Sequence, residues 1–180
     1  MVFVTPECLA ELVGQPEVEL SRPVLEDAEL RHAFDQPFSH WNAVPTADKK
    51  PILEELLTCA CGLMVRRYSS KPLADEHLTS LSRVRESLLD ELDCPPTLAA
   101  LAAMAGLSRY QLVRQFSKAH GLPPFAWLQQ HRVVRAQALI AKGTTLLDAA
   151  LTSGFSDQSH LTRAFARYRG FTPGAWQRAQ

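Results

Sequence analysis

The sequence predicts a mainly α-helical protein, in which two helix-turn-helix subdomains are joined by a long connector helix and preceded by a small, mostly helical N-terminal region. Three observations predict this fold. Apolar residues recur at helical spacing in most segments of the 180-residue chain. A helical-hairpin pattern at 97–121 is repeated at 145–170. Between the two copies, residues 123–142 begin with proline and are followed by Gly143, which is typical of one uninterrupted helix.

The first hairpin, TLAALAAMAGLSRYQLVRQFSKAHG, contains the signals that start and stop two helices. Thr97 can cap the first helix, Gly106 can supply the left-handed turn, and Ser108 can cap the second helix. Leu112 and Phe116 fall on the face of the second helix that must point into a core. The opposite face is basic and rich in hydrogen-bonding groups, which is typical of a helix that reads the DNA major groove, although any amphipathic surface helix places charges outward.

The second copy strengthens this interpretation because its outward positions repeat as well as its core. Gly106 aligns with Gly154 at a shift of 48 residues, and Arg114 aligns with Arg163 at a shift of 49. The cationic positions match while the residues beside them differ. This is expected if both helices contact phosphates and base edges but read different sequences.

The connector has the length that two such helices would need on one duplex. At about 1.5 Å per residue it forms a rod of roughly 30 Å, and one turn of B-DNA is roughly 34 Å. The two recognition helices are therefore predicted to enter successive major grooves on one face of double-stranded DNA. Thr145 and Asp148 give the start signal for the helix that follows the connector.

Eleven outward-facing positions are candidate DNA contacts. Arg114 and Arg163 lie near the centres of the two faces and are expected to contact bases or phosphates, whereas Lys118 and Arg167 are expected to contact phosphates. For the uncharged candidates, plain solvent exposure is the alternative. The full set is Arg109, Tyr110, Gln111, Val113, Arg114, Lys118, Gln158, Ser159, His160, Arg163 and Arg167.

Residues from about 78 to 178 resemble the DNA-binding domain of the AraC/XylS family of bacterial transcription regulators. The resemblance is carried mainly by GFSDQSHLTRAFARYRGFTP at 154–173, with support from LAALAAMAGLSRYQLVRQF and WLQQHRVVRAQALI. It implies a seven-helix domain that binds an asymmetric DNA site and regulates transcription, with RNA polymerase as a further partner. The chain departs from the family at Leu161, where an aromatic residue is usual, at Ala149, where isoleucine is usual, and at Trp176-Gln177, where Tyr-Arg is usual.

The resemblance divides the chain into residues 1–68, a linker at 69–77 and the DNA-binding domain at 78–180. Residues 3–68 are similar only to the tail end of the family's sensor domain, and the strands of its barrel are absent, which argues against control by a small-molecule effector. The chain would then be a shortened relative, the product of an internal start, or a piece of a longer protein.

The segment 49–68 predicts an amphipathic helix whose Glu54, Glu55, Arg66 and Arg67 face water. Two interpretations of its apolar stripe stay open: it packs on residues 20–40, or it pairs two copies of the chain in a homodimer. An alternative function follows from the second interpretation. The chain would not bind DNA itself but would pair with a full-length relative through its N-terminal helices and block it.

Charge supports a polyanionic partner, although the formal net charge is zero. Residues 97–180 carry ten Lys and Arg against two Asp, a net +8, and the rest of the chain carries −8. A split of this size predicts that the C-terminal half meets nucleic acid and that the N-terminal half stays away from it.

The sequence does not predict an enzyme, a metal site or a cofactor. The cysteines at 8, 59, 61 and 94 lack the spacing of a zinc site, and no Ser, His and Asp form a convincing catalytic set. A domain of similar type accompanies an alkyl-transferring DNA repair activity, but the cysteine set of that class is missing here. With no signal peptide and no apolar run of about eighteen residues, we expect a cytoplasmic, nucleoid-associated bacterial protein that does not enter a membrane.

Overall fold

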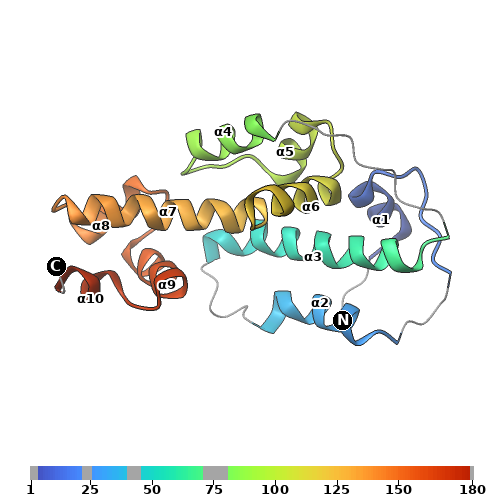
Figure 1. The fold of residues 1–180 in the computed structure, drawn as a ribbon, viewed down its shortest axis with the longest axis horizontal. Coiled ribbons are helices and arrows are strands. Elements are labelled where there is room, and N and C mark those ends of the chain that lie inside the picture. The colour runs from blue at the N-terminus through green and yellow to red at the C-terminus, as the bar shows by residue number, and fades with distance from the viewer. Residues whose placement is uncertain (1–3, 22–25, 40–45, 71–80, 179–180) are drawn as a thin grey trace.

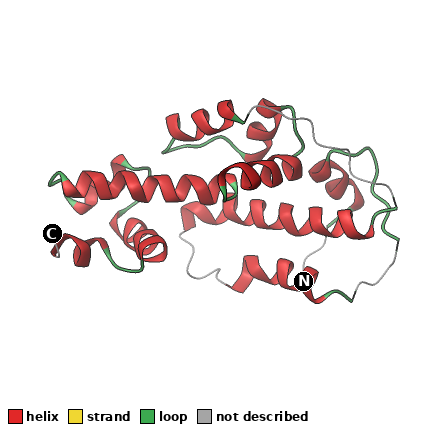
Figure 2. Ribbon diagram, viewed as in Figure 1, coloured by secondary structure: helices red, strands yellow, loops and turns green. Residues whose placement is uncertain are grey.

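The computed structural model describes residues 4–21, 26–39, 46–70 and 81–178. Within these ranges the regular structure is helical, and no strand is drawn (Figure 2). In the same ranges one isolated β-type pairing joins Leu20 to Ser69. The helices are α1 (Pro6–Val13), α2 (Ala28–Ser39), α3 (Thr46–Tyr68), α4 (Ser82–Asp90), α5 (Leu98–Ala105), α6 (Arg109–His120), α7 (Pro124–Ala141), α8 (Leu146–Thr152), α9 (Gln158–Arg169) and α10 (Pro173–Arg178). The predicted α-helical fold is confirmed.

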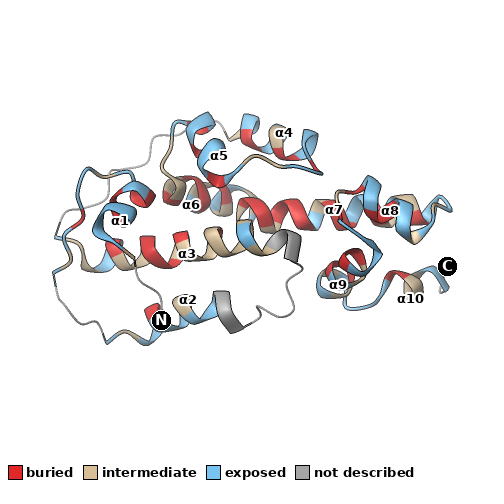
Figure 3. Ribbon diagram, turned by 180° about the vertical axis from the view of Figure 1, so that it is seen from behind, coloured by how far each residue is buried: buried red, intermediate tan, exposed pale blue. Residues whose placement is uncertain are grey.

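Helix α7 belongs to two separate hydrophobic cores, one for each predicted motif. Phe125, Trp127 and Leu128 in its first half pack with buried side chains of α4, α5 and α6. Val133, Ala136 and Ile140 in its second half pack with buried side chains of α8 and α9. The connector is therefore shared by both cores and fixes the two motifs relative to each other, with buried residues in both of its halves (Figure 3).

The helix boundaries follow the start and stop signals in the sequence. The side chains of Thr97, Ser108 and Thr145 cap α5, α6 and α8 as predicted. Gly106 adopts φ 68°, a left-handed conformation that lets α5 end and the chain turn into α6 without strain. The starts of α5, α6 and α8 are thus confirmed where the sequence predicts them.

The N-terminal helices cover the first motif instead of standing apart from it. Helix α3 lies alongside α6 and α7, with α2 on its outer side and α1 beside the opposite end of α6 from α7 (Figure 1). Asp27 and Glu29 of the α2 region bind Arg67 at 2.8 and 2.5 Å, which fixes α2 on the end of α3. The expectation that the helix at 49–68 packs on residues 20–40 is confirmed by this contact. Its use in a homodimer is not supported, because α1, α2, α6 and α7 already occupy its sides.

The prediction that Glu55 faces water is wrong. Glu55 is 2% exposed, and its carboxyl group accepts a hydrogen bond from the backbone N–H of Phe125 at 2.9 Å. Helix α7 starts at Pro124 without a side-chain cap from its own segment, so α3 supplies the acceptor that the helix start lacks. Burial raises the pKa of Glu55 to about 8, while the N–H groups of Phe125 and Ala126 act in the opposite direction.

Two expected elements differ in extent or fall outside the description. The helix expected at 78–94 is shorter, because α4 runs from Ser82 to Asp90 and residues 78–80 lie outside the described residues. Most of the expected linker at 69–77 also lies outside them.

Candidate nucleic-acid interface

The start of α6 is built around a reciprocal cap. Ser108 Oγ accepts a hydrogen bond from the N–H of Gln111 at 3.2 Å, and Gln111 Oε1 accepts one from the N–H of Ser108 at 2.9 Å. This is a capping box, which directs the third residue of the helix back toward its own start. The side-chain carbonyl of Gln111 is therefore committed to the helix, which was not expected of a residue that reads bases.

Tyr110 lies beneath the N-terminal helices and is only 7% exposed. It belongs to the cluster that contains Leu9, Val13 and Val65. Its ring lies so close to Gly62 of α3 that a Cβ at that position would overlap it. The expectation that Tyr110 lies on an open surface is therefore wrong in this arrangement, because α1 and α3 bury it.

Arg109 is held by acidic side chains from the same two helices. Its guanidinium lies 2.8 Å from Glu11 of α1 and 3.6 Å from Glu54 of α3, and the side chain is 18% exposed. The end of α1 also abuts the start of α6, because a Cβ at Gly14 would lie 2.8 Å from the Cβ of Ser108. In helix-turn-helix proteins the N-terminal residues of the recognition helix contact base edges. The N-terminal helices cover this end of α6.

The remaining candidates on α6 divide between core and surface. Val113 is 1% exposed and belongs to the core of the first motif, so its expected outward position is wrong. Arg114 and Lys118 are exposed, as expected. They lie one and two turns from the covered end, so α6 keeps an accessible cationic strip along its later turns.

Helix α9 is capped by Asp157. Asp157, rather than Ser156, accepts the N–H of His160 at 2.7 Å, and this hydrogen bond is the main reason that the pKa of Asp157 is lowered. His160 is 1% exposed, its Nδ1 lies 3.1 Å from the Ser156 hydroxyl, and its ring packs edge-on to Phe155. The prediction that His160 lies on the reading surface is wrong. It occupies the same position in α9 that Gln111 occupies in α6, where the side chain bonds back to the helix start.

The outward face of α9 is open. Gln158, Ser159, Arg163 and Arg167 are all exposed, as the sequence predicts. The helix is fixed from behind by Leu161 and Phe165, which are fully buried in the core of the second motif. Four candidate contacts are thus presented together on one rigid helix.

Arg132 is a cation of the C-terminal half that is buried and so does not contribute to such a surface. It is 4% exposed and, together with a second guanidinium contact, its Nε donates to the carbonyl oxygen of Leu92 at 2.9 Å. It joins the middle of α7 to the segment after α4. Its charged group therefore stabilises the fold and does not form part of a DNA-binding surface.

The acidic and small residues that cover α6 were missed by the sequence reasoning. Glu11 and Glu54 carry no motif, and the helical pattern of residues 49–68 predicts only that Glu54 faces water. Gly62 gave the signal that was overlooked, because a glycine inside a helix often marks the close approach of another side chain. Together with Glu55, Thr58 and Val65 it forms a buried stripe at helical spacing.

Within the described ranges no three His, Cys, Asp or Glu side chains group as metal ligands would. In that same part of the chain, no helix has both the length and the apolar composition needed to cross a membrane.

The C-terminal half matches a known family model and known structures. The model described as a helix-turn-helix domain matches residues 101–179. The DNA-binding domain of AdpA, a global transcriptional factor solved in complex with a target DNA, is 31% identical and aligns over 55% of this chain and 90% of that domain, with a TM-score of 0.50. A transcriptional regulator from Chromobacterium violaceum, described as containing an AraC-type DNA-binding domain, is 26% identical over 56% of this chain and 89% of its own, with a TM-score of 0.49.

A longer match is found to the HTH-type transcriptional regulator YbfI of Bacillus subtilis. It is 33% identical over 136 residues, which are 73% of this chain and 50% of the relative. The chain spans about half the length of the curated relatives it matches.

Proposed function

The chain belongs to the AraC family, and we propose that it is a sequence-specific DNA-binding transcription regulator that uses two helix-turn-helix motifs. The observation that carries this proposal is the open face of α9, where Gln158, Ser159, Arg163 and Arg167 are exposed on a helix whose back is buried. AdpA, whose DNA-binding domain was solved on DNA, supports the same use of the fold.

In the described arrangement, α9 is the helix whose exposed face can contact base edges in the major groove. Its Arg163 and Arg167 are one turn apart and can meet base edges and phosphates from one side of the major groove. Helix α7 has 18 residues and is about 27 Å long, which supports entry of α6 and α9 into successive grooves. RNA polymerase is the further partner that regulation of transcription would involve, and binding to chromosomal DNA would place the protein on the nucleoid in the cytoplasm.

Binding through both motifs requires the N-terminal helices to leave α6. The covered residues Arg109 and Tyr110 lie at the end of α6 that would face the bases. The described arrangement then corresponds to a state in which the second motif is available and the first is closed. DNA that engages both motifs shifts the population toward an open state. Residues 1–68 thus act as a cover, with 78–180 as the DNA-binding domain.

The test is selection of random double-stranded DNA by the purified chain, followed by titration of the enriched sequence and a scrambled one. We expect an asymmetric site in which one half, read by α9, is more strongly specified than the other. Failure to enrich any sequence, with equal affinity for the scrambled duplex, would overturn the proposal.

The alternative, a partner that pairs with a full-length relative through its N-terminal helices, makes a different demand on the structure. It needs α1 and α3 to expose surface that now packs on α6. Light scattering at micromolar concentration separates the two, because a single monomeric species that enriches a DNA sequence argues against pairing.

A further inference from the structure

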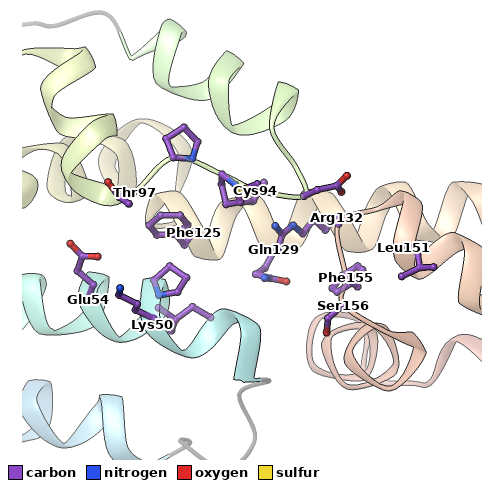
Figure 4. Close-up of a pocket in the computed structure, with 17 residues that line it drawn as sticks. Lys50, Glu54, Cys94, Thr97, Phe125, Gln129, Arg132, Leu151, Phe155 and Ser156 are labelled. Carbon is purple, nitrogen blue, oxygen red and sulfur yellow. The ribbon is translucent and has the colours of Figure 1, made fainter.

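A cavity of about 400 Å³ lies where the cover meets both motifs. One wall is the first part of α3 with Lys50 and Glu54, and a second wall is α7 with Phe125 and Gln129 (Figure 4). The segment at 93–97 and the turn at 154–156 close the other sides. No single motif forms this cavity, and its volume lies in the range of pockets that hold small molecules.

The cavity contains a buried polar atom that lacks a partner. Gln129 is 5% exposed, its side chain points from α7 into the space between α3 and the turn at 154–156, and its Oε1 accepts no hydrogen bond from the described residues (Figure 4). Buried carbonyl oxygens are nearly always paired, since leaving one unpaired costs about 1–3 kcal/mol. This oxygen is therefore suited to accept a hydrogen bond from a bound molecule.

The rest of the lining defines the class of that molecule. Much of it is apolar and includes the flat surfaces of Phe125, Phe155 and three prolines. The cations Lys50 and Arg132 are balanced by Glu54 and Asp93, so the lining has no net charge that would favour an ion. We propose that this cavity binds a small, uncharged, largely aromatic molecule whose single N–H or O–H group donates a hydrogen bond to Oε1 of Gln129.

Binding at this place stabilises the covered state. The occupant contacts α3 from the cover and α7 and the 154–156 turn from the DNA-binding domain, so it holds these parts together. A ligand that prefers one of two states shifts the equilibrium toward that state. This consequence rests on the proposed function: the occupant lowers the affinity of the chain for DNA. The cavity would give this chain a route to effector control.

The test of the site uses three probes and the 180-residue chain. Indole is uncharged and has one N–H donor, N-methylindole lacks the donor, and indoleacetate keeps the donor but is an anion. Heteronuclear NMR titration is expected to show shifts at the cavity residues with indole, and about tenfold weaker binding of each of the other two probes. No indole-dependent shifts at the cavity, or equal binding of indole and N-methylindole, would overturn the proposal.

Two variants test the residue assignment. Gln129→Leu removes the acceptor and is expected to weaken indole binding about tenfold, whereas Gln130→Leu, at the exposed next position of α7, leaves binding unchanged. Leu151→Trp fills the cavity from its half-exposed wall with Gln129 intact, and it should also abolish binding. Indole binding that survives both Gln129→Leu and Leu151→Trp would place the ligand elsewhere and refute the site.

The regulatory consequence is measured separately, by titrating the selected DNA with and without saturating indole. A lower affinity in the wild type, and no change in Gln129→Leu, is the expected result. If indole binds at the cavity and the affinity for DNA is unchanged, the site stands and its coupling to DNA binding is refuted. If no DNA sequence can be selected, the proposed function fails while the NMR result still decides the site.

Discussion

The guanidinium of Arg109 and the carboxylate of Glu11 form an ion pair at 2.8 Å that joins the recognition helix of the first motif to the first helix of the chain. Because the Glu11 side chain is 74% exposed, the pair itself adds little stability. The contact is held by the apolar cluster beneath it, in which Val13 and Tyr110 are buried together. Release of the cover should therefore depend on the cluster more than on the charges.

Val13→Asp is expected to raise the affinity for the selected DNA site about fivefold or more, because an unpaired charge in this cluster detaches α1 from α6. Fluorescence anisotropy measures the affinity, and hydrogen exchange in α1 reports its release. The matched control is Cys8→Asp, which places the same charge at an exposed position of the same helix. If exchange shows α1 released and the affinity is unchanged, the cover does not limit DNA binding.

Arg163→Ala is expected to weaken binding by about 1–3 kcal/mol and to relax the sequence preference in the half-site that α9 reads. Arg114→Ala should reduce the affinity for DNA less in the wild type, because α6 is partly covered. The reduction should be larger in the Val13→Asp background, where the cover no longer keeps α6 from contacting DNA. Arg83→Ala on the exposed face of α4 serves as the control. Equal costs of Arg114→Ala in both backgrounds would contradict the dependence of the first motif on the cover.

Capping and core packing explain why most of the fold could be predicted from the sequence. The caps at Thr97, Ser108 and Thr145 act within four residues, and the two cores follow from apolar spacing on single helices. Exposure was also predicted correctly where it depends only on packing within a helix's own motif, as at Arg163 and Arg167.

The predictions of side-chain exposure are wrong where a side chain contacts a distant segment of the chain or caps a helix. Tyr110 lies on the outer side of its own hairpin, but α1 and α3, which are far away in the sequence, cover it. Glu55 looks like a solvent-facing acid on a helical wheel, but it meets the start of α7, 70 residues later. His160 was assigned from its register in the repeat, whereas its position in the first turn directs the ring back to Ser156.

Lys118→Ala and Arg167→Ala are expected to lower affinity by similar factors for every duplex, because phosphate contacts do not distinguish sequences. Each substitution should reduce the slope of log affinity against log salt by about one, which a titration series at several salt concentrations measures. A change in sequence preference with an unchanged slope would show that these side chains contact bases.

Glu55→Gln is expected to remove a pH dependence of stability. Burial raises the pKa of Glu55 from its ordinary value of 4.5 to about 8, so between these values the unfolded chain releases a proton that the folded chain keeps. The free energy of unfolding therefore falls as pH rises through this window. Glutamine keeps an oxygen that accepts the Phe125 N–H but does not ionise. At pH 8 the free energy of unfolding of the variant should therefore exceed that of the wild type by on the order of 2 kcal/mol.

Urea denaturation at several pH values between 5 and 8 measures this difference. Glu86→Gln, on the exposed surface of α4, is the control and should follow the wild-type profile. Parallel profiles for Glu55→Gln and the wild type would show that Glu55 does not hold its proton in the folded state.

Gly154→Ala is expected to destabilise the junction of the two motifs far more than Gly170→Ala, although both glycines have a left-handed backbone with φ of 82° and 83°. Alanine costs about 1–2 kcal/mol at either position for this conformation. Only at Gly154 would the new Cβ also lie 2.5 Å from the Leu92 carbonyl oxygen and 2.9 Å from Nε of Arg132, whereas at Gly170 it meets nothing within 4 Å. Relieving that overlap separates Arg132 from the carbonyl oxygen to which it donates and leaves a buried guanidinium poorly paired. We therefore expect Gly154→Ala to lower the free energy of unfolding by about 2 kcal/mol more than Gly170→Ala, as measured by urea denaturation. Equal losses in the two variants would show that the Leu92–Arg132 contact does not fix the second motif against the first.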